Sequence, residues 1–148
     1  MTATSHRDTI LLVDDDPPIR RLIRRSLESQ EHQLLEACNG DEALRLAAAH
    51  HGPIDLLVTD VVMPRMDGFT LGECLVESHP EIHVLFLSGQ ADRSTAVRGG
   101  LREAGQSFLL KPFTRDCLLR ANRDQLRAEP ARRPAAERAP ATDSATAD

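Results

Sequence analysis

The sequence lacks the features that mark membrane proteins, secreted proteins and nucleic-acid-binding proteins. No apolar run approaches the roughly 20 residues that a membrane-spanning helix needs. The first residues, MTATSHRDT, do not form the basic-then-apolar pattern of a secretion signal. The net charge of −5 gives no reason to expect a basic surface for nucleic acid. We therefore expect a cytoplasmic protein with neither a membrane nor a nucleic-acid partner.

Cysteine and histidine are too few and too scattered to suggest a zinc site or a disulfide framework. The three cysteines, Cys38, Cys74 and Cys117, are odd in number, far apart and without a C-x-x-C pair. We interpret them as buried, reduced thiols of a cytosolic protein. The six histidines show no ligand spacing. With 41% apolar and 28% charged residues in 148, the composition is that of one globular domain with a sizeable core.

Apolar strands and amphipathic helices alternate five times along the chain. The strands are expected at 9–13, 33–37, 56–60, 82–87 and 107–110, and each is followed by a helical pattern, the fourth at about 93–103. This alternation predicts a parallel sheet with right-handed crossovers and helices on both faces. We assign residues 1–8 to a flexible start, 9–127 to the domain, and 128–148 to a disordered Ala/Pro-rich tail. The tail is too short and too irregular to form a DNA-binding module.

Several helix ends can be assigned from local patterns. Asp16 before Pro17-Pro18 predicts the N-cap of the first helix, and Asn39 with Glu42 is close to a capping box. The first helix has one expected apolar face (Ile19, Leu22, Ile23 and Leu27) and one arginine face (Arg20, Arg21, Arg24 and Arg25). We interpret the arginines as a solvated face, with partner docking as the alternative. The pair Gly99-Gly100 should weaken the fourth helix.

Four of the predicted strands end in charged or hydroxyl side chains, and parallel strands bring such ends to one rim of the sheet. The groups are Asp14 and Asp15, then Asp60, then Ser88, then Lys111. Each alone is ordinary: a helix cap, a turn residue or a solvated lysine. Together, clustered carboxylates call for a hard divalent cation such as Mg²⁺, and a hydroxyl with an ammonium suits phosphoryl oxygens. The set predicts Mg²⁺-dependent phosphoryl transfer onto a carboxylate.

Four motifs, in order and with fitting gaps from about Thr9 to Leu126, carry a family resemblance. VDDDPPIR, VTDVVMPRMDG, LSG and FLLKPF resemble the response-regulator receiver domain of two-component signalling. The C-terminal part of the domain is also similar to receivers of hybrid histidine kinases, which points to a phosphorelay. The resemblance implies a flavodoxin-like, doubly wound α/β fold with strand order 2-1-3-4-5 and five helices. The chain would be a single-domain response regulator and a switch, not an enzyme with a small substrate.

The resemblance also implies roles for individual residues. Asp60 would be the phosphoacceptor, loaded by a histidine kinase or a histidine phosphotransfer protein. Mg²⁺ would be bound by Asp15, Asp60 and the backbone carbonyl of Val62, with Asp14 acting through water. Lys111 would pair with the acyl phosphate, ahead of a cis peptide to Pro112.

Two further residues would carry the switch. The Ser88 hydroxyl would move to the phosphate and the Phe108 ring would follow it. This would reshape the face of the fourth helix, fifth strand and fifth helix for a downstream protein target or a homodimer. Apolar Val62 cannot hold an attacking water whereas Gln90 could, so the phosphoryl lifetime is undetermined.

Two alternatives remain at the level of sequence. A haloacid-dehalogenase-type phosphatase would use Asp14 as its nucleophile in D-x-D, although Pro18 stands where that family has Thr or Val. A pseudo-receiver would keep the fold as a binding module without phosphorylation. The sequence names neither the kinase, the output partner, the signal nor the role of the tail.

Overall fold

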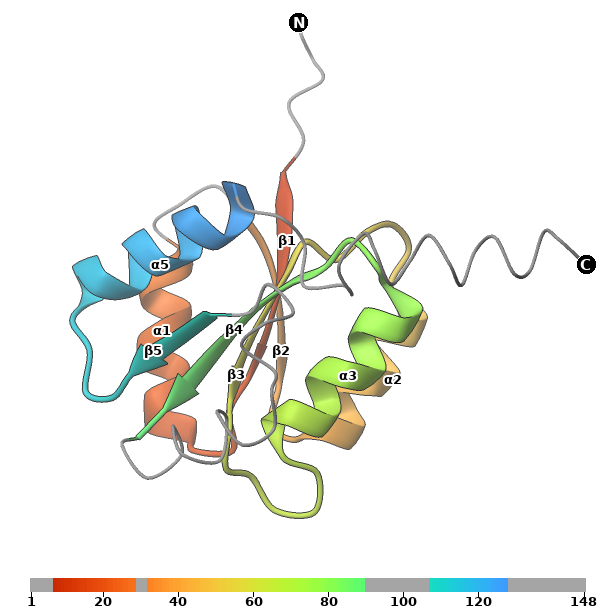
Figure 1. Cartoon of the computed structure of the whole chain (residues 1–148), viewed down its shortest axis with the longest axis horizontal. Helices are drawn as coiled ribbons and strands as arrows, with labels where there is room; N and C mark the ends of the chain where they lie inside the picture. The colour runs from red at the N-terminus through yellow and green to blue at the C-terminus, as the bar shows by residue number, and fades with distance from the viewer. Residues whose placement is uncertain (1–6, 29–31, 90–106, 128–148) are drawn as a thin grey trace, which may run out of the picture.

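The computed structural model describes residues 7–28, 32–89 and 107–127, drawn in colour in Figure 1. In chain order the elements are β1 (Asp8–Val13), α1 (Pro17–Glu28), β2 (His32–Ala37), α2 (Gly40–Ala49), β3 (Leu56–Asp60), α3 (Gly68–Ser78), β4 (His83–Ser88), β5 (Ser107–Leu110) and α5 (Arg115–Arg127). The expected fourth helix with Gly99-Gly100, Gln90, the first residues and the C-terminal tail lie outside the described residues. The alternation of strand and helix predicted from the sequence is confirmed within them.

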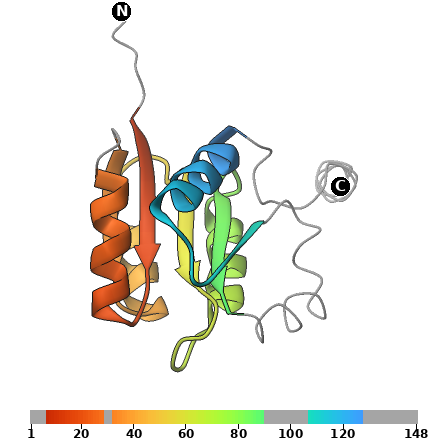
Figure 2. The same cartoon turned by 90° about the vertical axis from the view of Figure 1, so that its left-hand side faces the viewer.

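All strand pairs of the sheet are parallel, in the order β2-β1-β3-β4-β5. The doubly wound α/β fold and its strand order are therefore as predicted. Val13 lies beside Thr59, Asp60 beside Leu87 and Ser88 beside Leu110, so the carboxyl ends of β1, β3, β4 and β5 are level with one another. These strand ends share one edge of the sheet, toward the bottom of Figure 2.

Helices cover both faces of the sheet, and this explains the unbroken apolar runs of the central strands. In Figures 1 and 2, α1 and α5 lie on one face, and α2 and α3 lie on the other. Successive strand residues point to opposite faces. Leu11 and Val13 thus join the core under α2 and α3, whereas Ile10 and Leu12 join the core under α1 and α5. A strand buried on both sides needs apolar residues at every position.

The helix N-termini are capped as the sequence predicts. Asp16 accepts a hydrogen bond from Ile19 N at 3.5 Å, and Asn39 accepts one from Glu42 N at 2.8 Å. The Glu42 carboxylate accepts from Cys38 N at 2.7 Å, one residue before the N-cap amide that a capping box would use. These bonds satisfy backbone donors that have no partner inside the helix.

Two predictions of burial are wrong. Leu22 is 56% exposed, and Ser26 is buried on α1 in its place. Leu22 lies at the edge of the apolar stripe, about 100° around the helix from Ile23. Of the cysteines, Cys38 and Cys117 are exposed and Cys74 is half-buried; all three are free thiols.

Within the described residues, no helix combines the length and the apolar character that crossing a membrane requires.

Candidate functional site

Asp60 is the last residue of β3, and its carboxylate is held by two donors at the end of the sheet. Lys111 Nζ lies 2.7 Å from Asp60 Oδ1, and the Val61 amide donates to the same oxygen at 3.1 Å. The Asp60 side chain is 10% exposed and that of Lys111 is 32% exposed, so this ion pair is partly withdrawn from water. Behind it, Gly68 begins α3 so close to the Asp60 backbone carbonyl that a Cβ atom would clash there. The start of α3 is therefore pressed against the end of β3.

Asp14 and Asp15, which follow β1, complete an acidic cluster with Asp60. One carboxylate oxygen from each of the three lies within 4.8 Å of the other two. Asp14 is fully buried; its Oδ1 accepts from Asp16 N at 2.9 Å, and its Oδ2 has no hydrogen-bond partner. A buried, unpaired carboxylate oxygen is costly unless a cation neutralises it. An all-oxygen donor set with this unsatisfied atom suits Mg²⁺.

The electrostatics of the cluster are those of a site that needs a cation. Burial, together with the neighbouring charge of Asp60, raises the pKa of Asp14 from 3.8 to about 6, although the hydrogen bond from the Asp16 amide acts in the opposite direction. Burial also raises the pKa of Asp60, although the Lys111 ammonium acts in the opposite direction. Both carboxyl groups would therefore hold their protons more tightly than usual, and a bound divalent cation would displace them.

Ser88 ends β4, next along the sheet from Asp60. It is fully buried, and its hydroxyl has no hydrogen-bond partner. Its backbone carbonyl accepts from Lys111 N at 2.8 Å, which ties the end of β4 to the start of the Lys111 loop. The Lys111–Pro112 peptide is cis, as the sequence predicts.

Phe108 lies on β5, partly buried, and stacks on Phe86 with ring centroids 5.1 Å apart. Phe69 meets Phe86 edge-on at 4.9 Å. The aromatic residue that the resemblance selects thus packs against the core under α2 and α3.

The structure brings together Asp14, Asp15, Asp60 and Lys111, and places Ser88 on the adjacent strand end. Val62 is 61% exposed in the loop after β3. Sequence reasoning missed Gly68 and Arg20, whose guanidinium contacts the Asp14 carbonyl at 2.7 Å. For Gly68 the sequence did hold a signal, the glycine of the MDG turn. For Arg20 it held none, because a contact with a backbone carbonyl does not depend on the type of the residue that carries the carbonyl.

Comparison with known proteins identifies the family of this chain. The family described as "Response regulator receiver domain" matches residues 10–123. The chain belongs to this family. As a receiver domain of two-component systems, it is of a class that generally signals instead of turning over a small substrate. Family membership also separates it from the phosphatase that the D-x-D pattern allowed.

Curated relatives of this receiver domain include a sensor kinase and a response regulator. Sensor kinase CckA of Brucella abortus (strain 2308) is 41% identical over 113 residues, 76% of this chain and 12% of that protein. Response regulator GtcR of Aneurinibacillus migulanus is 34% identical over 105 residues, 71% of this chain and 42% of GtcR. The chain thus spans less than half the length of these relatives.

Solved structures that are similar to this chain are also receiver domains. The receiver domain from hybrid histidine kinase CckA is 33% identical, with a TM-score of 0.67 over 80% of this chain and 98% of that one. A response regulator receiver domain protein from Clostridium thermocellum is 27% identical, with a TM-score of 0.73 over 81% and 94%.

Proposed function

We propose that this receiver domain is a phosphoacceptor whose Asp60 takes a phosphoryl group from a histidine kinase or a histidine phosphotransfer protein. One observation carries the proposal: Lys111 Nζ, 2.7 Å from Asp60 Oδ1, faces a cluster of three carboxylates in which Asp14 Oδ2 is buried and unpaired. Lys111 can serve the phosphoryl oxygens, and the acidic cluster can hold the cation that their transfer needs.

In the transfer, an Asp60 oxygen attacks phosphorus while the phosphorus–nitrogen bond of the donor breaks, and the electron pair leaves with the imidazole. Asp14, Asp15, Asp60 and the Val62 carbonyl would hold Mg²⁺, which when bound offsets negative charge among carboxylates and phosphoryl oxygens. Lys111 orients the Asp60 carboxylate beforehand and pairs with a phosphoryl oxygen afterwards. Hydrolysis of the acyl phosphate resets the domain.

The response would begin at Ser88. Its buried, unpaired hydroxyl has an acceptor to gain when Asp60 carries phosphate, and the Lys111 N–Ser88 O bond links its strand end to β5. Phe108, partly buried beside Phe86, is the ring that would follow. By family resemblance, the readout is the face of the fourth helix, β5 and α5. Its expected partner is a downstream protein or a second copy, and not nucleic acid, because the net charge is −5.

Intact-mass spectrometry after incubation with acetyl phosphate or phosphoramidate, with and without Mg²⁺, tests the proposal. We expect one added phosphoryl group that requires Mg²⁺ and is absent from Asp60→Asn. Asp67→Asn is the matched control: Asp67 caps α3 by accepting from Thr70 N at 2.8 Å, and Asn caps equally well. A mass shift that persists in Asp60→Asn would place the chemistry elsewhere. No shift in the wild type with either donor would favour an unphosphorylated binding module.

A further inference from the structure

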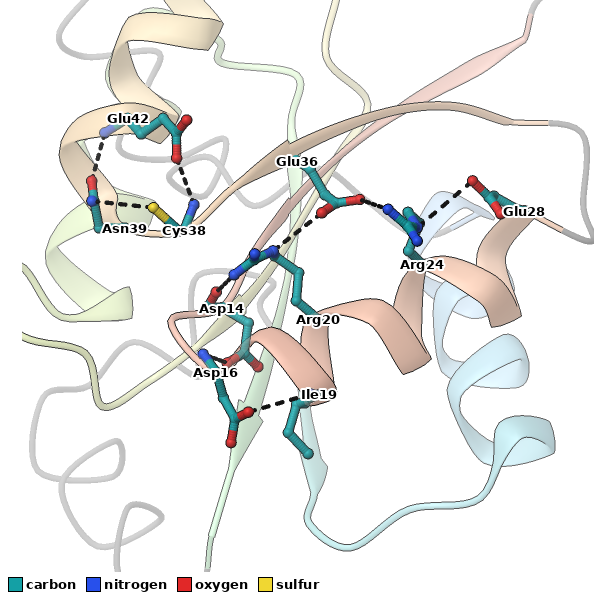
Figure 3. Close-up of polar contacts among 10 residues, drawn as sticks. All are labelled: Asp14, Asp16, Ile19, Arg20, Arg24, Glu28, Glu36, Cys38, Asn39 and Glu42. Atoms are coloured by element: carbon teal, nitrogen blue, oxygen red, sulfur yellow. Dashed lines mark hydrogen bonds and ion pairs between the residues drawn. The ribbon is translucent and has the colours of Figure 1, made fainter.

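An arginine of α1 holds the backbone of the acidic cluster. Arg20 Nη1 donates to the Asp14 carbonyl oxygen at 2.7 Å, and Arg20 Nε donates to Glu36 Oε1 at 3.1 Å. Figure 3 shows this guanidinium between the loop after β1 and the Glu36 side chain of β2. Its side chain is only 19% exposed. One residue thus joins α1, β2 and the loop that carries Asp14 and Asp15.

The same Glu36 carboxylate binds a second arginine one helical turn further on. Arg24 Nη1 donates to Glu36 Oε2 at 3.3 Å, and Arg24 Nε lies 3.9 Å from Glu28 (Figure 3). The contacts described for Arg24 involve Glu36 and Glu28, and none reaches Asp14. Because Glu36 compensates the charge of Arg20, the contact of Arg20 with Asp14 acts mainly through geometry.

That geometry decides where the Asp15 carboxylate can lie. The Asp14 amide donates to Ala37 O at 3.3 Å, Oδ1 accepts from the Asp16 amide, and the carbonyl accepts from Arg20. The Asp14–Asp15 peptide is planar, so a fixed carbonyl also fixes the direction in which Asp15 leaves the chain. Asp15 is exposed, and within the described residues no hydrogen bond holds its carboxylate. Its place in the cluster therefore depends on its backbone.

We propose that Arg20 is a positioning residue for the cation site: by clamping the Asp14 carbonyl, it keeps the Asp15 carboxylate facing Asp14 and Asp60. The proposal rests on the Mg²⁺ site of the proposed function. It predicts that loss of the guanidinium weakens cation binding, although Arg20 touches neither the cation nor the phosphoryl group.

The test compares Arg20→Met with Arg24→Met in the full chain. Each variant loses one contact with Glu36 and keeps the apolar stem, but only the first loses the Asp14 clamp. Isothermal titration calorimetry with MgCl₂ should show about tenfold weaker affinity for Arg20→Met, as is typical when a partner of a metal ligand is removed. Arg24→Met should stay within about twofold of wild type, which corresponds to under 0.5 kcal/mol.

Phosphorylation by acetyl phosphate gives a second readout. In Arg20→Met, the Mg²⁺ concentration for half-maximal rate should rise by the same factor as the dissociation constant, and the rate at saturating Mg²⁺ should stay near that of wild type. Urea denaturation without Mg²⁺ checks that both variants fold. A merely structural role would lower stability without this selective effect on Mg²⁺.

Wild-type Mg²⁺ affinity in a folded Arg20→Met, or an equal loss in Arg24→Met, would overturn the proposal. If Arg20→Met does not fold, Arg20→Lys replaces it. Lys keeps the charge but has one ammonium for two acceptors, so we expect the Mg²⁺ affinity to fall about threefold. An unchanged Mg²⁺ affinity would contradict the proposal. Wild-type binding of Mg²⁺ without phosphoryl uptake would overturn the role of Asp60 and leave the calorimetric comparison decisive for Arg20.

Discussion

At the scale of single residues, the acidic cluster that the proposed function requires also lowers the stability of the folded protein. Asp14 is fully buried beside two other carboxylates, and its pKa of about 6 reflects the free energy that ionisation costs the folded state. The pKa of Asp14 in the folded protein lies above the ordinary value of 3.8, so the protonated carboxyl favours the folded state. This contribution to stability is fully present below about pH 4. That contribution is lost as the pH rises through about 6.

Asp14→Asn should therefore stabilise the Mg²⁺-free protein at neutral pH. Asn keeps the acceptor for the Asp16 amide and removes the buried charge. We expect a gain on the order of 1–2 kcal/mol in the free energy of unfolding at about pH 7.5, shrinking toward about pH 5, where the wild-type carboxyl regains its proton. Urea denaturation in the presence of EDTA measures this difference.

Added Mg²⁺ should reverse the ranking, because a ligand stabilises only the protein that binds it. Wild type should gain stability with Mg²⁺, more at about pH 7.5 than at about pH 5 because protons compete for the same oxygens. Asp14→Asn should gain much less. Asp16→Asn, a change at an exposed N-cap, is the control and should behave as wild type. A destabilised Asp14→Asn in EDTA would contradict the account of the buried charge.

The sequence predicts which side chains meet at this edge of the sheet because one rule of parallel sheets places them there. Asp14, Asp60, Ser88 and Lys111 stand at or just after the carboxyl ends of apolar strands, and parallel strands bring those ends together. Arg20 could not be found in this way. Its partner is a backbone carbonyl that becomes available only when β1 ends and α1 turns back.

At the scale of elements, α1 shows where periodicity fails. An apolar residue at the edge of a helical stripe fits the pattern whether or not the neighbouring layer reaches it. Ile23 contacts the core under α1 and α5, whereas Leu22, next in sequence, is 56% exposed. The predicted burial of the cysteines was wrong for a related reason. Cys38 follows an edge strand, and Cys117 lies in the first turn of α5, so both stand at the margin of the packed layers.

Substitutions on α1 should separate these neighbours. Leu22→Lys should change the free energy of unfolding by less than about 0.5 kcal/mol because its side chain is already in water. Ile23→Ala should cost about 2–4 kcal/mol through lost burial and a cavity. Urea denaturation of both variants measures this, with far-UV circular dichroism to report helix content. A large loss in Leu22→Lys would show that Leu22 is covered in the folded protein.

The junction of β3 and α3 gives a second comparison. Gly68→Ala would drive a Cβ into the Asp60 carbonyl, so we expect a loss of about 1–3 kcal/mol and slower phosphorylation of Asp60. Gly72→Ala is the matched control on the same helix, where the new methyl would meet the Phe86 ring at 3.4 Å. Helix propensity favours Ala there by up to about 1 kcal/mol, so it should be neutral or stabilising. Equal changes in stability in the two variants would contradict the close approach of Gly68 to the Asp60 carbonyl.

At the scale of the whole molecule, the two cores depend on different parts of the chain. The core under α2 and α3 draws on residues up to Phe108, whereas the core under α1 and α5 is closed by α5. Leu118 is 1% exposed there, and Leu119 and Leu126 pack against the same cluster. The sequence predicts this architecture because strand–helix alternation and right-handed crossovers leave few topologies. The order 2-1-3-4-5 itself came from the family resemblance, since alternation alone does not order the strands.

The domain boundary at residue 127 can be tested by truncation. A chain ending at Arg127 retains α5 and every residue that the described part of the chain contributes to the two cores, so its midpoint of thermal unfolding should lie within about 2 °C of the full chain. A chain ending at Thr114 loses α5 and exposes the cluster around Ile23 and Leu27, and should lose cooperative unfolding. Differential scanning calorimetry distinguishes the two. If removing residues 128–148 alone lowered the midpoint by more than about 5 °C, the C-terminal segment would be part of the folded domain, and the boundary would have to move beyond Arg127.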